Sequence, residues 1–212
     1  MMHTIGMIAQ KGGTGKTTLS IHLAVQASLS GIKVLLVDID PQASATAWWR
    51  RRKTQKPELV QTDGGKLQGV LNSARQQGYE LVIIDSAPHS SAAAGICAKL
   101  SDLILIPSRP AILDLDAIGV TTSLVEQVGV KAWIVLNACP HPTRYGEPQI
   151  VSEAREALRI YNIPVCEPSL SQRAAFSHAL IDGRAITEFD PGSKAAAEVL
   201  MLWDTLTREL KL

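Results

Sequence analysis

Two hydrophobic periodicities alternate along the chain. Short, nearly continuous apolar runs bounded by Gly, Asp or Pro are typical of strands that are buried on both faces. Between these runs, apolar residues recur every three or four positions, as in helices with one buried face. The predicted strands cover residues 5–9, 34–37, 81–84, 103–106 and 132–136. The predicted helices cover residues 16–29, 43–53, 67–77, 92–100, 115–128, 148–161, 172–181 and 193–210.

This alternation of strand and helix predicts an α/β fold, with a mostly parallel twisted sheet covered by helices on both faces. The chain has 212 residues and shows no internal repeat or linker, so we expect residues 1–212 to form a single domain. Ligands of such sheets bind at the carboxyl ends of the strands. The chemistry is therefore expected just after Ala9, Val37, Ile84 and Leu136.

Composition narrows the classes of function. Hydrophobic residues make up 46% and charged residues 19% of the chain, which excludes intrinsic disorder. The net charge is +1, so bulk charge cannot hold nucleic acid, and polyanion binding would need a local patch. No run of about 18 apolar residues occurs, and the N-terminus lacks the layout of a signal peptide. We therefore expect a cytoplasmic protein.

A phosphate-binding loop follows the first predicted strand and precedes the first predicted helix. Its glycines let several backbone N–H groups point at one anion, and the helix adds its positive N-terminal end. Lys16 is predicted to reach the β- and γ-phosphates, and the Thr17 hydroxyl to ligate Mg²⁺. The predicted nucleotide contacts in this loop are Lys11, Gly12, Gly13, Thr14, Gly15, Lys16, Thr17 and Thr18.

Three aspartates follow predicted strands at the same edge of the sheet. Alternation along the second strand puts Asp38 and Asp40 on one side. Two adjacent carboxylates near Mg²⁺ can have different roles. Asp38 would hold the metal, and Asp40 would orient or deprotonate the attacking water. Asp85 would bind Mg²⁺ through a water, although an aspartate after a strand also suits a helix N-cap or a turn.

The loop departs from the usual form, because Gln10 stands where its first glycine is expected and Lys11 comes next. Together with the run Asp38-Ile39-Asp40-Pro41-Gln42, this deviant Walker A sequence resembles the ParA/MinD family of ATPases. The resemblance implies a P-loop NTPase fold of the SIMIBI-like kind, with ATP and Mg²⁺ as cofactors. It also implies that Lys11 reaches across a face-to-face homodimer to the other subunit's nucleotide, so that Lys11, Lys16 and Asp40 are catalytic.

The same resemblance implies a timed switch. ATP holds the homodimer together, intrinsic hydrolysis is slow, and an adaptor protein, often ParB-like, stimulates it. Asn137, after the last predicted strand, would read the adenine edge, although Asn also suits a turn. Residues 86–91 are small and polar, which fits either a switch segment that senses the γ-phosphate or an ordinary loop.

Relatives of the ParA type position cargo along non-specific DNA, whereas MinD binds membrane through a C-terminal tail. The C-terminal segment here has apolar spacing but few cations, so we interpret it as a docked helix and expect DNA, not membrane, as the track. The predicted function is partition or positioning of cargo, foremost plasmid or chromosomal DNA, with nucleoid association in the ATP-bound state. Residues 50–53 are interpreted as a solvated helix end. The candidate DNA contacts are Arg173, Arg184, Lys194 and Arg208.

Three other functions use related sequences. MinD-like membrane positioning is the first alternative. A small-molecule ligase such as dethiobiotin synthetase uses the loop without the paired aspartates. A reductase of the nitrogenase iron-protein type needs cysteines that bridge a cluster across the dimer, for which Cys97 and Cys139 are candidates by number only. Free cysteines such as these are usually small buried hydrophobes.

Overall fold

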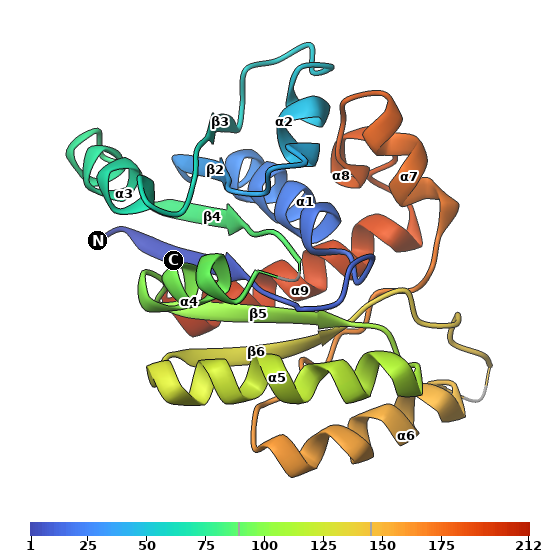
Figure 1. The fold of residues 1–212 in the computed structure, drawn as a ribbon. Coiled ribbons are helices and arrows are strands. Elements are labelled where there is room, and N and C mark those ends of the chain that lie inside the picture. The colour runs from blue at the N-terminus through green and yellow to red at the C-terminus, as the bar shows by residue number, and fades with distance from the viewer. Residues whose placement is uncertain (89, 145) are drawn as a thin grey trace.

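Six strands form one sheet in the order β3-β2-β4-β1-β5-β6, and every neighbouring pair is parallel (Figure 1). This computed structural model describes residues 1–88, 90–144 and 146–212. The parallel sheet predicted from the sequence is confirmed. Over the described residues, the strands are β1 (His3–Met7), β2 (Val34–Asp38), β3 (Glu58–Gln61), β4 (Leu81–Asp85), β5 (Leu103–Ser108) and β6 (Lys131–Leu136).

Helices cover both faces of this sheet, because successive strand side chains point to opposite sides. On β2, Leu36 belongs to one hydrophobic cluster, and Leu35 and Val37 belong to the other. The first cluster is covered by α1 (Lys16–Leu29), α2 (Ser44–Trp49), α7 (Ala174–Ile181), α8 (Ile186–Phe189) and α9 (Lys194–Leu210). The second is covered by α3 (Leu67–Gln76), α4 (Ser91–Lys99), α5 (Ile112–Val128) and α6 (Gln149–Leu158), which continues into a 3-10 turn, Arg159–Tyr161.

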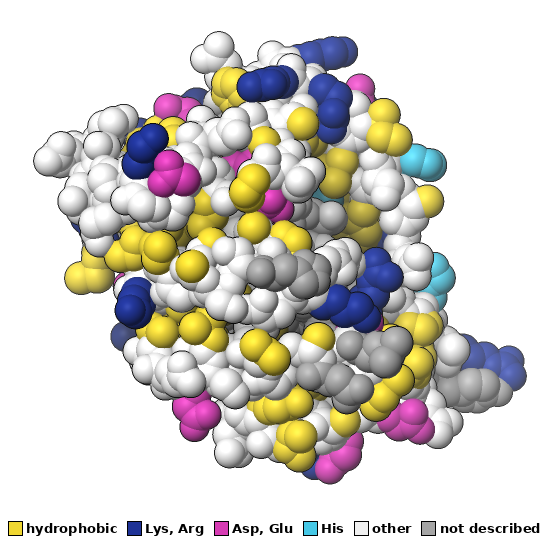
Figure 2. All heavy atoms as spheres, viewed as in Figure 1, with side chains coloured by type: hydrophobic (Ala, Val, Ile, Leu, Met, Phe, Trp, Pro, Cys, Tyr) yellow, Lys and Arg dark blue, Asp and Glu magenta, His cyan; other side chains and the backbone are white. Residues whose placement is uncertain are grey.

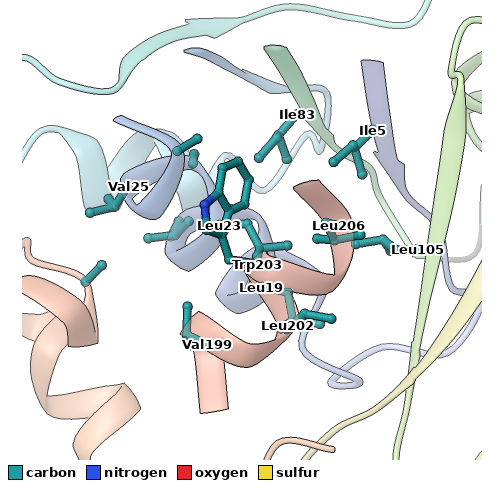
Figure 3. Packing of buried hydrophobic residues seen from close by; sticks show 14 of the residues in the cluster. Ile5, Leu19, Leu23, Val25, Ile83, Leu105, Val199, Leu202, Trp203 and Leu206 are labelled. Atoms are coloured by element: carbon teal, nitrogen blue, oxygen red, sulfur yellow. The ribbon is translucent and has the colours of Figure 1, made fainter. Parts of the chain in front are cut away.

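The C-terminal helix α9 packs against α1 in the first cluster (Figure 3). Trp203 and Leu206 of α9 are buried together with Leu19 and Leu23 of α1. The Trp203 indole N–H also donates to Ser30 Oγ at 3.1 Å, just beyond the end of α1. The apolar face of α9 is therefore covered by the domain itself, as the sequence predicts for a docked helix.

Some predicted boundaries are wrong. The edge strand β3 was not predicted, because none of its four residues is fully buried and its pattern is correspondingly weak. The predicted helix 43–53 ends at Trp49 as α2, since the chain then turns back on itself. The short helix α8 was missed as well. No helix in the described residues combines the length and hydropathy that a membrane span requires.

Candidate nucleotide-binding and hydrolysis site

The phosphate loop lies between the end of β1 and the start of α1, at the carboxyl edge of the sheet. Gly13 and Gly15 have φ values of 75° and 101°, a left-handed region that favours glycine. A Cβ atom at Gly15 would lie 2.0 Å from Asn137 Nδ2, so a larger residue would also collide with the neighbouring segment. The loop conformation therefore depends on glycine at this position, directly before Lys16 opens α1.

Lys16 is directed into its own loop. Its side chain is buried, and its Nζ donates to the carbonyl oxygens of Ala9 at 3.0 Å and Lys11 at 3.4 Å. Burial lowers the pKa of Lys16, and the carboxylates of Asp85 and Asp40 oppose that shift. An anionic phosphate would be a stronger partner for this ammonium than two neutral carbonyl groups.

Asp38 and Asp85 are cross-strand neighbours at the ends of β2 and β4, and both are fully buried. Asp38 is held by three donors. Its Oδ2 accepts from the Thr46 amide at 2.9 Å and from the Thr46 hydroxyl at 2.8 Å, and its Oδ1 accepts from the Asp40 amide at 3.1 Å. Thr46 of α2 and the Asp40 backbone thus fix the orientation of this carboxylate.

Asp85 is less well satisfied. Its Oδ1 accepts from the Ser20 hydroxyl at 3.3 Å, whereas its Oδ2 is buried without a hydrogen-bond donor. Burial raises the pKa of Asp85 to about 7, and Asp38 adds to that rise, while the Thr17 hydroxyl and Lys16 oppose it. A hard divalent cation with oxygen ligands would relieve both the orphaned oxygen and the crowding of carboxylates. The residues predicted to hold Mg²⁺, which are Thr17, Asp38 and Asp85, therefore fit the ion.

Asp40 lies at the mouth of this group, partly exposed. Its Oδ1 accepts from the Gln42 amide at 2.9 Å, which makes a local turn after β2. Its charge acts on both Lys16 and Asp85. The structure thus brings the predicted water-handling carboxylate to the same edge as the loop lysine and the metal-site carboxylates.

The Lys11 side chain has a different partner from the Lys16 side chain. Its Nζ lies 2.7 Å from Asp114 Oδ2, and the side chains are 37% and 7% exposed. Asp114 is in the first turn of α5, where the helix dipole favours a carboxylate. The two loop lysines therefore serve different partners in this subunit, and the cross-subunit role of Lys11 stays a prediction.

Asn137 lies against the phosphate loop. Its Nδ2 donates to the Thr14 carbonyl at 2.8 Å, so the side chain braces the loop, and its contact with adenine stays a prediction. Of the predicted switch segment, Ser86 donates to the Met7 carbonyl at 2.6 Å, while His89 lies outside the described residues.

Sequence reasoning missed three residues near the loop: Thr46, Asp114 and Arg109. The Arg109 guanidinium lies 3.7 Å from where a Cβ at Gly13 would stand. Arg109 and Asp114 follow β5, a strand after which no chemistry was predicted. Thr46 lies in an alanine-rich segment at the start of α2, where the sequence pattern does not indicate a role.

The four predicted DNA contacts do not form one cluster. Arg173 is 19% exposed and pairs with Glu198 at 2.7 Å, and Arg184 pairs with Asp182. Lys194 and Arg208 are exposed, but they stand at opposite ends of α9, about 21 Å apart along its axis. Their DNA-binding role stays a prediction.

The cysteines are all buried, and burial raises the pKa of the Cys97 thiol to about 12 and that of Cys139 to about 11. Neither of these thiols lies at the surface, where a cluster bridging two subunits would need it. The environment therefore gives no support to the iron–sulfur reductase alternative.

A glycine-rich loop between strand and helix, a buried lysine and carboxylates at the strand ends define a P-loop nucleotide hydrolase. Residues 5–186 match the family described as the CobQ/CobB/MinD/ParA nucleotide binding domain. The chain belongs to this family, and it is an ATPase of the ParA/MinD type.

Relatives cover most of the chain. It is 33% identical to the maintenance of carboxysome distribution protein A of Gloeobacter kilaueensis over 198 residues, 92% of this chain and 88% of that protein. It is 26% identical to the chromosome-partitioning ATPase Soj of Thermus thermophilus over 153 residues, 58% of this chain and 61% of that one. Apo McdA of Cyanothece has the same fold, with a TM-score of 0.76 and 18% identity over 97% of this chain and 100% of that chain.

Proposed function

We propose that this protein is an ATP-dependent dimerising switch that positions or partitions a large cargo along non-specific DNA, with an adaptor protein that stimulates hydrolysis. Relatives named for carboxysome distribution and for chromosome partition support the positioning role. They also leave two classes of cargo: DNA, which the sequence predicts, and a carboxysome-like protein assembly, which the relative aligned over most of both chains suggests.

The observation that best supports the switch is that the side chains of the two loop lysines have different partners. Lys16 faces the inside of the loop, while the Lys11 ammonium is partly exposed and bonded to Asp114. Exchange of Asp114 for phosphate oxygens of a second subunit would leave the Lys16 interactions intact. Two subunits facing each other across their nucleotides would then each complete the other's site, so that dimerisation requires ATP.

Each residue at the strand ends has a defined task in this scheme. Asp40 holds the water that attacks the γ-phosphorus and accepts its proton as the bond to the β–γ bridging oxygen breaks. Thr17, Asp38 and Asp85 would hold Mg²⁺, which supplies neutralisation of the phosphate charge. Lys16 and Lys11 add positive charge from the two subunits.

Substitution of Lys11 tests the proposal. Lys11→Ala should bind ATP but stay monomeric and lose about a hundredfold or more in phosphate release, because the charge supplied in trans is absent. Nucleotide binding by fluorescence, sedimentation with ATP, and phosphate release are measured together. An ATP-dependent dimer of normal affinity in this variant would refute the role of Lys11.

Asp40→Ala is the companion variant. It should bind ATP and dimerise normally, yet hydrolyse about a hundredfold more slowly, because water is no longer oriented. Asp63→Ala, which removes an exposed aspartate before α3, is the charge control. Phosphate release near the wild-type rate in Asp40→Ala would show that another group handles the water.

The membrane alternative has less support, because the apolar face of α9 is buried against α1. ATP-dependent binding to duplex DNA that weakens steeply with salt is expected, together with no co-sedimentation with liposomes. DNA binding that ignores the nucleotide would argue against the DNA track.

A further inference from the structure

We propose that exposed cations after α2, together with Arg184, form a surface that binds the phosphate backbone of duplex DNA when nucleotide is bound. This inference rests on the proposed function and assigns its track to a surface. We call this surface the α2 basic patch, and it consists of Arg50, Arg51, Lys53, Lys56 and Arg184.

The patch is built around a buried arginine. The Arg52 side chain is 1% exposed, so the prediction of a solvated helix end is wrong for this residue. Its guanidinium lies 4.8 Å from the Trp48 ring centroid and donates to Glu188 at 2.8 and 3.0 Å. It also donates to the carbonyl oxygens of Lys56 and Gly183, at 3.0 and 2.9 Å. The loop after α2 is therefore folded back on itself and bonded to the turn between α7 and α8.

Backbone contact brings these two segments together. A Cβ at Gly183 would lie 2.6 Å from the Arg51 carbonyl carbon and oxygen, and Gly183 has a φ of 72°. Arg184, next in the chain, is therefore held beside Arg51. Its guanidinium also stacks over the Phe189 ring, 4.6 Å from the centroid. Ordering the backbone that carries these cations before binding reduces the entropy that binding must overcome.

The local charge is positive, although the chain is nearly neutral. Arg50, Arg51, Lys53 and Lys56 are exposed, and within the described residues none of the four forms an ion pair. Glu188 pairs with Arg52 and Asp182 pairs with Arg184, so these four charges cancel, and the positive surplus comes from Arg50, Arg51, Lys53 and Lys56 against exposed Glu58. Figure 2 shows Lys and Arg side chains gathered at the top of the molecule, over α2 and the connection to β3 in Figure 1.

The chemistry of the patch fits a nucleic-acid backbone better than a membrane. Between Arg50 and Lys56 the other exposed side chains are Thr54 and Gln55, both polar. Arg, Lys, Thr and Gln are the side chains that contact DNA phosphates, and such contacts need no base sequence. An interfacial membrane site would also need exposed apolar side chains to insert between lipids, and this loop offers none.

The patch is connected to the nucleotide site through α2. Thr46 near the start of α2 holds Asp38, and the Ala43 amide donates to the Asp40 carbonyl at 2.8 Å. The helix then runs for only six residues, about 9 Å, before the cations begin. A shift of Asp38 or Asp40 upon nucleotide binding would move α2. DNA binding by the α2 basic patch could then depend on ATP.

The test compares two sets of three neutralised charges in the full chain. Arg50→Gln/Arg51→Gln/Lys53→Gln removes the core of the patch, and Lys194→Gln/Arg208→Gln/Lys211→Gln removes three exposed cations of α9 and its end. Binding to a random-sequence duplex is followed by fluorescence anisotropy with ATP or ADP over a salt series. The patch variant should bind at least about tenfold more weakly with ATP, and its salt slope should fall by about 2.7, since each lost phosphate contact contributes about 0.9. The α9 variant removes Lys194 and Arg208, two of the DNA contacts predicted from the sequence, so it tests the competing surface; if the α2 basic patch is the DNA surface, this variant should bind as the wild type does.

Folding and dimerisation separate the outcomes. Thermal unfolding and ATP-dependent sedimentation of the patch variant should match the wild type, because all three side chains are exposed and none forms an ion pair with the residues that the structure describes. Wild-type DNA binding that survives in the patch variant, or is lost in the α9 variant instead, would overturn the patch and leave the proposed function standing. Absence of DNA binding by the wild type with ATP would overturn both the patch and the DNA track. Unchanged DNA binding with lost stimulation by an acidic adaptor would reassign the surface to a protein.

Discussion

At the scale of single residues, Asp114 decides where Lys11 rests in an isolated subunit. The pair joins a lysine in the phosphate loop to a nearly buried carboxylate more than one hundred positions away. A pair of this kind contributes about 1 kcal/mol. In the proposed dimer each subunit would have to break it before Lys11 reaches the opposite nucleotide, so on this proposal the ion pair opposes ATP-dependent dimerisation.

Asp114→Asn should strengthen the ATP dimer, because it removes the charge that holds Lys11 in its own subunit. A loss of about 1 kcal/mol per subunit corresponds to about a fivefold change for each of the two lysines. Sedimentation equilibrium with ATP measures the change, and Asp102→Asn, which lies beyond β4 and α4 at the amino end of β5, controls for the loss of an aspartate. A weaker dimer in Asp114→Asn would show instead that Asp114 helps to hold Lys11 in the position that it takes in the ATP-bound dimer.

Whether a site residue could be predicted depends on whether nearby sequence or distant packing fixes its position. The phosphate loop and the three aspartates could be predicted, because a contiguous loop and the ends of parallel strands fix their positions. Asp114 and Arg109 could not, since only the packing of β5 and α5 beside the loop brings them there. Thr46 was equally hidden, because its role is a hydrogen bond back to Asp38 across a turn.

At the scale of elements, α2 depends on the bonds between Thr46 and Asp38. Thr46→Val removes the hydroxyl donor at 2.8 Å and keeps the shape of the side chain. A buried carboxylate would then have one donor fewer, which costs about 1–3 kcal/mol of unfolding free energy. Chemical denaturation should show this loss, and Thr54→Val, in the exposed loop, should show almost none.

The same variant probes the connection from nucleotide to patch. If α2 transmits the nucleotide state, Thr46→Val should reduce the difference in DNA affinity between ATP and ADP while patch charges are intact. An unchanged ATP preference would mean that dimerisation alone confers it, without movement of α2.

The elements with clear periodicity were predicted, and those without it were not. The five strands with mostly buried patterns were found, whereas β3, at the sheet edge, has no fully buried residue. The end of α2 was also misplaced, because apolar spacing alone cannot show that Arg52 turns inward to bond the chain ahead of it. Tertiary contacts determine both features.

At the scale of the whole molecule, His22 joins α1 to the C-terminal helices. It is fully buried, its Nδ1 accepts from the Ile186 amide at 3.1 Å, and its ring meets Phe176 edge to face at 5.1 Å. A proton on Nδ1 would place two donors against each other, so the ring must stay neutral. Burial lowers the pKa of His22 to about 3.

This lowered pKa makes stability depend on pH. The unfolded chain binds a proton at His22 below about pH 6.5 while the folded chain does not, so stability falls with pH from there toward about pH 3. The slope is at most about 1.4 kcal/mol per pH unit, and the loss between pH 6.5 and 5 is about 1.6 kcal/mol, because the unfolded histidine is half protonated at pH 6.5. His22→Asn, whose side-chain oxygen can replace Nδ1 as acceptor, should lack this contribution, whereas His178→Asn, at an exposed position on α7, should keep it. Urea denaturation at the two pH values measures the difference. Equal losses of stability in all three proteins would show that the titration of His22 does not set the acid response of the fold.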